Sequence, residues 1–170
     1  LGLAAGMLFL NASVDLRRRW SVITDEEFDL QINRNFRSSV KLLQLFVPEM
    51  QARGWGRVIT VGSVQQKKPH EEMLIYAASK MALYNVCLSL SNILAGDGVT
   101  VNNLAPGAIR TDRNSEALSD PAYDQRVRNL IPIKYIGQPC DLAGIAVYLA
   151  SEESRYMTGQ NIFVDGGKGF

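Results

Sequence analysis

The chain has 170 residues, of which 46% are hydrophobic and 21% are charged, and its formal net charge is +1. This length and composition are typical of one globular domain with enough apolar residues for a buried core. The small net charge gives no electrostatic basis for binding nucleic acid or an anionic membrane surface. We therefore expect a single domain over residues 1–170 whose partners include neither nucleic acid nor a membrane.

The cysteines, the histidine and the first ten residues exclude further classes of protein. Cys87 and Cys140 lie far apart without the spacing of a metal site, and His70 is the only histidine. We predict no metal site and two reduced thiols, which are typical of a cytoplasmic protein. Residues 1–10 are apolar, but this stretch is too short to span a bilayer and lacks the basic leader of a signal peptide.

The first predicted elements are a strand and a long helix. The apolar run Met7–Leu10 predicts a buried parallel strand. Thr24–Glu27 has the pattern of a capping box and opens a helix predicted to end near Ala52, before Gly54. Apolar residues recur along this helix at helical spacing: Phe28, Ile32, Phe36, Val40, Leu43 and Phe46.

The rest of the chain alternates between strands and helices. The predicted strands are 57–61, 100–104 and 162–164, and the predicted helices are 74–95, 116–130 with an interruption at Pro121, and 141–150. Nearly uninterrupted apolar strands that alternate with helices indicate a parallel sheet covered on both faces. With right-handed crossovers, this pattern predicts an α/β fold in three layers, a Rossmann-like doubly wound sheet.

Tyr76 and Lys80 are four positions apart in the predicted helix 74–95, so they project from one face. A free phenol has a pKa of about 10, and a neighbouring ammonium group would lower that pKa. A phenol tuned in this way can exchange a proton with an alcohol or a carbonyl oxygen. Ser63 follows the strand 57–61, at the edge where parallel sheets bind ligands. Taken alone, the pair also fits a packed tyrosine beside a solvated lysine.

Several further motifs follow in a consistent order. They are Leu10–Ser13, Asn35, Ser63, Tyr76–Lys80, Val101–Gly107, Thr111 and Met157–Gly167. From about residue 8 onward, this order resembles the short-chain dehydrogenase/reductase family. The family's glycine-rich phosphate loop has no counterpart, and the asparagine motif already begins at residue 10. We therefore expect the C-terminal two-thirds of a Rossmann-like dehydrogenase, without its first strand–helix units.

The resemblance implies an NAD(P)-dependent oxidoreductase that interconverts a secondary alcohol and a ketone by hydride transfer. It implies that Tyr76 is the acid/base, that Lys80 is its electrostatic partner and binds the nicotinamide ribose, and that Ser63 holds the substrate oxygen. Asn35 would bend its helix and hold a water that links Lys80 to solvent. An exposed polar residue is the alternative at that position, and Asn33 offers a competing register.

The resemblance also implies which residues meet the cofactor, NAD or NADP. Asn11 would stabilise the sheet near the adenosine half, although Ser13 replaces the glycine of the family's motif and adds a Cβ beside the cofactor. Pro106 and Gly107 would turn the chain beneath the nicotinamide, a pair that equally makes an ordinary strand-ending turn. The Ile109 backbone and the Thr111 hydroxyl would hold the carboxamide.

Substrate choice and assembly are expected to depend on surface segments. Segments 64–75 and 114–133 flank the predicted site and are candidate mobile lids. The polar and cationic residues 65–68 of the first segment would suit a hydroxylated or anionic substrate. They equally fit an ordinary solvated loop. By resemblance, a homodimer or homotetramer would form through 35–52 and 83–95. The alternative is a non-catalytic binding or scaffold protein of the same fold, since a domain without a phosphate loop should hold a dinucleotide poorly.

Overall fold

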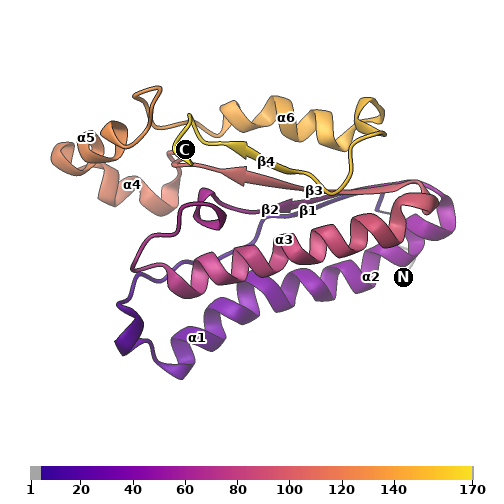
Figure 1. Ribbon diagram of the computed structural model, residues 1–170, viewed down its shortest axis with the longest axis horizontal. Helices are drawn as coiled ribbons and strands as arrows, with labels where there is room; N and C mark the ends of the chain where they lie inside the picture. Colours follow the sequence, from indigo (N-terminus) through magenta and orange to yellow (C-terminus); the bar gives the residue numbers. More distant parts are fainter. Residues whose placement is uncertain (1–4, 170) are drawn as a thin grey trace.

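The computed structural model describes residues 5–169, in which four parallel strands form one sheet in the order β1-β2-β3-β4. The strands are β1 (Met7–Leu10), β2 (Gly56–Val61), β3 (Val99–Pro106) and β4 (Asn161–Val164). Because all four strands run parallel, their C-terminal ends share one edge, on the left in Figure 1. Loops that leave this edge therefore meet in space although they are far apart in sequence.

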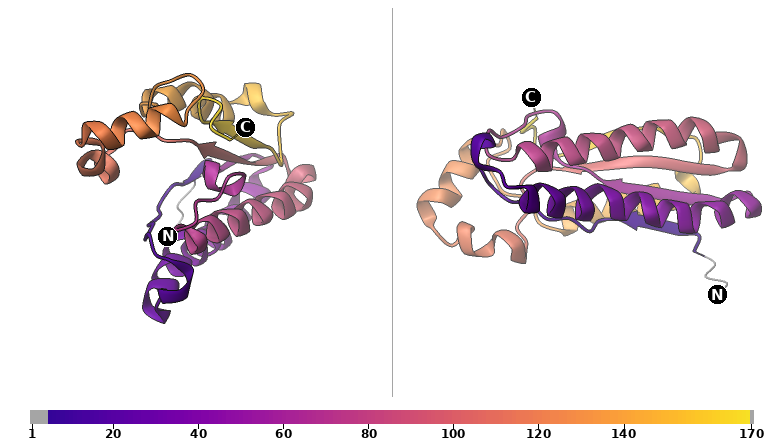
Figure 2. Two further views of the ribbon diagram at one scale, coloured as in Figure 1. Left: turned by 60° about the vertical axis from the view of Figure 1, so that its left-hand side comes forward. Right: turned by 90° about the horizontal axis from the view of Figure 1, so that it is seen from below.

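Helices cover both faces of the sheet and make three layers (Figure 1). One face carries α1 (Asp25–Ile32), the π-helical turn η2 (Asn33–Arg37), α2 (Ser38–Arg53) and α3 (Leu74–Leu94), and the other carries α6 (Cys140–Ala150). Figure 2 shows α2 and α3 side by side along the sheet. The predicted α/β, Rossmann-like fold is confirmed.

Two shorter helices lie beyond the C-terminal ends of the strands, α4 (Asp112–Leu118) and α5 (Pro121–Asn129) (Figure 1). Short 3-10 turns complete the fold: η1 (Trp20–Val22), η3 (Val64–Gln66), η4 (Ala95–Asp97) and η5 (Glu152–Ser154). The interrupted helix predicted for 116–130 is in fact two helices, and the first starts earlier than predicted. Pro121 lacks an N–H group and therefore begins α5, where Asp120 caps the new helix by accepting from Ala122 N at 2.9 Å.

The long helix on the first face begins and ends as its sequence predicts. Thr24 Oγ1 accepts from Glu27 N at 3.2 Å, and Glu27 Oε2 accepts from Thr24 N at 3.3 Å, which completes the capping box. At the other end, Gly54 takes a left-handed conformation with φ 71°, where a residue without a Cβ meets no steric cost. The π-helical turn between α1 and α2 adds a local bend inside this otherwise continuous helix.

Alternation along the strands divides the core around the sheet into two clusters, one on each face. Val58 packs toward α2 and α3 together with Leu43 and Cys87, whereas the next residue, Ile59, packs toward α6 with Leu149. Successive strand side chains point to opposite faces, so each strand contributes to both clusters. This two-sided burial is what the apolar strands predict.

β1 is less buried than predicted. Leu10 is buried against the α2–α3 side, but Met7 and Phe9 point to the other face and are 53% and 43% exposed. The reason is that α6 contacts β2 and β3, whereas β1 lies at the far edge of the sheet. The prediction of a buried parallel strand at Met7–Leu10 therefore holds for the α2–α3 side of β1 and is wrong for the other side.

The hand of the connections also differs from the prediction. The strand order advances in one direction from β1 to β4, while α3 and α6 lie on opposite faces (Figure 1). Among parallel strands, this arrangement gives the β2-to-β3 and β3-to-β4 connections opposite hands. Right-handed crossovers throughout were expected, but the last connection first passes through α4 and α5 beyond the sheet edge.

No helix within residues 5–169 is long and apolar enough to cross a membrane.

Candidate active site

Ser63, Tyr76 and Lys80 lie together at the C-terminal edge of the sheet. Ser63 follows β2 with an extended backbone, and its Oγ accepts from Gln65 N at 3.2 Å, which starts η3. Tyr76 and Lys80 lie on successive turns at the beginning of α3, and all three side chains are buried. The Ser63 side chain lies close enough to the Tyr76 phenol to lower its pKa. Loop and helix thus bring together the three polar groups that the sequence separates.

Lys80 is a buried cation rather than a solvated one. Only 1% of the residue is exposed, and its Nζ donates to Val61 O at 2.7 Å and lies 5.6 Å from the centroid of the Tyr76 ring. Burial lowers the pKa of Lys80 to about 8, with a smaller lowering by Arg113 and an opposing effect of Asp15. At neutral pH most of the Lys80 side chains therefore still carry a positive charge.

The pKa of Tyr76 is raised, not lowered as the Tyr–Lys spacing predicts. Burial is the largest cause, because a phenolate loses its hydration in this position. The Ser63 side chain works in the opposite direction, and Asp15 and Arg113 act with opposite signs. The prediction fails because burial dominates, while the Lys80 ammonium donates to the Val61 carbonyl and is not among the groups that change this pKa. The phenol is therefore protonated at neutral pH.

Asn35 is fully buried in the π-helical turn η2, which excludes the exposed alternative. Its Oδ1 accepts from Val14 N at 2.7 Å, and its Nδ2 donates to Val14 O at 2.8 Å and to Ser79 Oγ at 3.1 Å. Asn33, the competing register, is exposed. Asn35 therefore joins the loop after β1 to the helix that carries Tyr76.

A buried hydrogen-bond network around the Gln66 and Asn103 side-chain amides supports the backbone of Ser63 and Lys80. Gln66 Oε1 accepts from Ser63 N at 3.3 Å and from Asn103 Nδ2 at 3.0 Å, while Gln66 Nε2 donates to Lys80 O at 2.7 Å. Thr60 Oγ1 donates to Asn103 Oδ1 at 2.7 Å. A solvated Gln66 was one interpretation of its loop, and its burial contradicts that interpretation. The signal for its role is the capping-box pattern that Ser63 and Gln66 form.

Comparison with known proteins assigns the family. A sequence profile described as enoyl-(acyl carrier protein) reductase matches residues 5–168. "Dehydrogenase/reductase SDR family member 4" of Bos taurus is 36% identical over 145 residues, which cover 85% of this chain and 52% of that protein. The chain belongs to the short-chain dehydrogenase/reductase family.

Solved structures of the same family share the fold closely. A 3-oxoacyl (acyl-carrier-protein) reductase from Agrobacterium tumefaciens with NADP bound is 39% identical, with a TM-score of 0.94 over 97% of this chain and 65% of that one. A gluconate 5-dehydrogenase from Burkholderia cenocepacia, in complex with NADP and tartrate, is 30% identical, also with a TM-score of 0.94 over 97% and 65%. The chain spans about half the length of the curated relative from Bos taurus and about two thirds of these structures.

Several residues that the family resemblance points to already have partners within the chain. Gly107 N donates to Val164 O at 3.0 Å, and a Cβ at Gly107 would lie 2.6 Å from Asp165 Cα, so the Pro106–Gly107 turn fits against β4. Asn114 joins Ile109 and Thr111 at the start of α4. Its Nδ2 donates to Ile109 O at 2.7 Å, and its Oδ1 accepts from Thr111 N at 2.9 Å.

The asparagine motif at Leu10–Ser13 differs from that of the family in sequence, and its contacts differ from those expected. Asn11 is exposed, and within the described chain its side chain makes no hydrogen bond, so the sheet-stabilising role expected of it is not seen. Ser13 stands where the motif of the family has glycine. The Ser13 backbone oxygen accepts from Arg113 Nη2 at 2.6 Å, which ties the motif to α4.

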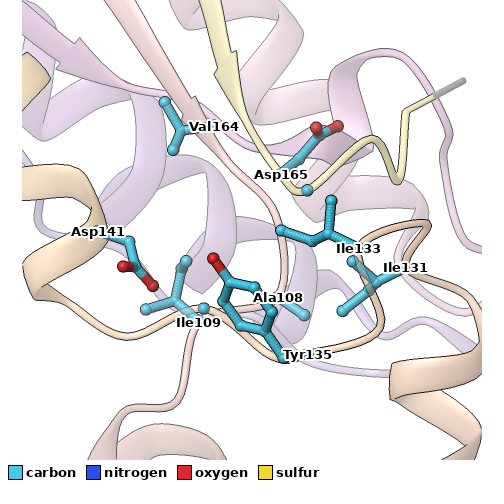
Figure 3. A pocket seen from close by; sticks show the side chains of 10 residues that line it. Ala108, Ile109, Ile131, Ile133, Tyr135, Asp141, Val164 and Asp165 are labelled. Carbon is cyan, nitrogen blue, oxygen red and sulfur yellow. The ribbon is translucent and has the colours of Figure 1, made fainter.

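A separate cavity of about 60 Å³ lies under the segment after α5, and Figure 3 shows Tyr135, Asp141 and Asp165 around it. Both carboxylates are already used, since Asp165 accepts from Gly167 N and Gly169 N and Asp141 accepts from Gln138 N. A space of this size holds one or two waters. The cavity does not include the buried residues around Tyr76.

Proposed function

We propose that the protein is an NAD(P)-dependent oxidoreductase that interconverts a secondary alcohol and a ketone. The observation that carries this proposal is the burial of Tyr76 beside Ser63 and the cationic Lys80, at the sheet edge where the family's chemistry takes place. NADP in the structures of related enzymes supports the cofactor class. When bound, the nicotinamide supplies or accepts the hydride at the substrate carbon.

Lys80 fits a hydroxyl-bearing cofactor. An ammonium group has three donors, and the Val61 carbonyl accepts one of them. In this proposal, the other two donors hold ribose hydroxyls. Ile109 and Thr111 would meet the carboxamide, and Pro106, Gly107 and Asn11 would border the cofactor. These are the roles expected from the family.

Tyr76 and Ser63 handle the substrate oxygen in this proposal. In carbonyl reduction, the Ser63 hydroxyl binds the oxygen, and the Tyr76 O–H gives it a proton as the hydride reaches the carbon. The raised pKa of Tyr76 keeps that proton on the phenol at neutral pH. Alcohol oxidation runs the same steps backwards, and the Tyr76 phenolate then takes the proton of the alcohol.

The expected proton route runs from Lys80 to solvent through a water, and Asn35 supports this route indirectly. Both polar atoms of its side chain already have partners in Val14 and Ser79. We therefore assign any water between Lys80 and solvent to backbone groups of the π-helical turn, which lie outside the regular helical pairing. The side chain of Asn35 keeps that turn in place.

The test is Tyr76→Phe in the full-length protein. We expect turnover to fall by at least about 100-fold, the range for loss of a general acid, with dinucleotide affinity nearly unchanged. Oxidation of NADH and NADPH would be followed with two ketone substrates, a 3-oxoacyl thioester and a ketogluconate. These match the 3-oxoacyl reductase and the gluconate 5-dehydrogenase to which the chain is similar. Tyr156→Phe, which removes the hydroxyl of a fully exposed tyrosine outside the site, serves as the matched control. Unchanged turnover would contradict the role of Tyr76, and a protein that binds neither dinucleotide would support the scaffold alternative.

We also propose a cytoplasmic homo-oligomer that forms through α2 and α3. Large apolar side chains stay exposed along these helices: Leu42, Leu45, Leu88 and Ile93. Light scattering on the purified protein would test this assembly. A monomer at micromolar concentration would contradict it.

A further inference from the structure

The side chain of Arg113 on α4 holds the loop that follows β1. Its Nη2 donates to Ser13 O at 2.6 Å, and both Nη atoms approach Ser13 Oγ, at 3.4 and 3.3 Å. Its Nη1 also pairs with Asp15 Oδ1 at 3.3 Å. The planar guanidinium thus contacts two residues of one loop, which a single ammonium group would do less well.

The same loop is held from the other side by Asn35 of η2. Val14 lies between Ser13 and Asp15, and its N–H and C=O both bond to the Asn35 side chain. Asn35 in turn donates to Ser79 Oγ, and Ser79 Oγ donates to Tyr76 O at 2.7 Å. Residues 13–15 therefore connect α4 to the backbone of Tyr76 through the hydrogen bonds of Asn35 and Ser79.

Asp15 and Arg113 also act on both titrating groups of the site, with opposite signs. Asp15 raises and Arg113 lowers the pKa of Tyr76, and the two have the same opposing effects on the pKa of Lys80. Asp15 comes from the loop after β1 and Arg113 from α4, while Lys80 lies one turn along α3 from Tyr76. The carboxylate and the guanidinium are paired with each other, and their effects on the pKa of Tyr76 have opposite signs.

We propose that Asp15 and Arg113 are positioning residues that work as an ion pair: they hold α4 against the loop after β1 and place one negative and one positive charge beside the site. This inference rests on the proposed roles of Tyr76 and Lys80. It adds Asp15 and Arg113 to the residues that shape the site, and neither residue belongs to the motifs from which the site was predicted.

Substitutions in the pair should leave the protein folded. The side chain of Arg113 is 49% exposed and that of Asp15 is 22% exposed. Ion pairs with this exposure add little to stability. Arg18 offers a matched control, because it is 50% exposed, comes from the same loop, pairs with Glu27 at 2.7 Å and is not among the causes of either pKa change.

The experiment compares Asp15→Asn, Arg113→Gln, the double variant and Arg18→Gln in the full-length protein. The titration of Tyr76 would be followed by NMR with ¹³C-labelled tyrosine and assigned with Tyr76→Phe, alongside the pH profile of kcat/KM. We expect Arg113→Gln to move the titration to higher pH, Asp15→Asn to move it to lower pH, and the double variant to return toward wild type. Arg18→Gln should leave it unchanged.

Opposite shifts are the result that a merely structural contact would not give. Shifts in the same direction, or no shift in either single variant, would overturn the proposal. Arg113→Lys keeps the charge but loses the planar fork, so it should preserve the titration while raising KM. If Arg113→Gln does not fold, Asp15→Asn alone decides by the sign of its shift. The titration needs no turnover, so opposite shifts in an inactive protein would support the pair and count against the proposed function only.

Discussion

Gln66 Nε2 donates to the backbone oxygen of Lys80 at 2.7 Å and thereby joins the loop after β2 to the helix that carries Tyr76. The other end of the same amide accepts from Ser63 N and Asn103 Nδ2. One buried side chain therefore sets the distance between Ser63 and α3. Because buried polar groups are costly to leave unpaired, this contact resists changes in the spacing of the site.

Replacing Gln66 with Leu should affect both stability and catalysis. The change leaves Ser63 N–H and Asn103 Nδ2 without one partner each, which should lower the free energy of unfolding by about 1–3 kcal/mol. Turnover should fall because Ser63 loses its support. Urea unfolding and steady-state kinetics measure the two effects. Gln51→Leu, which removes only an exposed contact to Asp97, should stay within about 0.5 kcal/mol.

Replacing Gly62 with Ala should disturb the same network by steric means. A Cβ at Gly62 would lie 2.3 Å from Gln66 Oε1 and 2.5 Å from Asn103 Nδ2, so the amides must move apart. We expect a loss of about 1–3 kcal/mol in thermal or urea unfolding. In α6, a Cβ at Gly144 meets nothing within 4 Å, and Gly144→Ala should stabilise by about 0.5–1 kcal/mol. Equal effects of the two variants would rule out the steric explanation.

The buried Lys80 should make stability rise with pH in a defined window. Its pKa is about 8 in the folded protein and 10.5 ordinarily. Between pH 8 and pH 10.5, the unfolded chain therefore binds more protons at this residue than the folded protein does. Below pH 8 the burial of the charge costs about 3 kcal/mol, and this cost disappears as the pH rises to 10.5.

The stability difference between wild type and Lys80→Met isolates this effect. Burial raises the pKa of the Cys87 thiol to about 12, which acts in the opposite direction above pH 9 but is present in both proteins. We expect the free energy of unfolding of wild type to gain up to about 3 kcal/mol relative to Lys80→Met between pH 8 and 10.5. A constant difference across urea titrations in this range would show that Lys80 keeps its ordinary pKa.

A further stability prediction concerns Arg57, which lies near the N-terminal end of β2, at the edge of the sheet opposite the site. Its buried guanidinium pairs with Glu152 at 2.8 Å, donates to Ser151 O and lies over the Trp55 ring. Glu152→Gln removes the counter-charge of a buried cation and should cost about 1–3 kcal/mol. The neighbouring Glu153→Gln should cost less than about 0.5 kcal/mol. If chemical denaturation gives equal values for the two, the buried pair contributes no more than a surface contact.

Local rules account for most of the elements. The Thr24–Glu27 capping box and Gly54 bound a helix through hydrogen bonds and φ values that involve near neighbours only. Pro121 divides its segment because it lacks an N–H group. The apolar strands also indicate their two-sided burial, except at β1, where coverage depends on how far α6 extends across the sheet.

By itself, the sequence determined the order of strands and helices, the sheet edge that receives Ser63, and the pairing of Tyr76 with Lys80 on one helical face. These follow from periodicity, capping and turn chemistry, which act over a few residues. Only the tertiary structure decided the raised pKa of Tyr76, the burial of Gln66, and the contact of Asp15 with Arg113. Hydration and charge at a site depend on every element packed around it, and those elements come from distant parts of the chain.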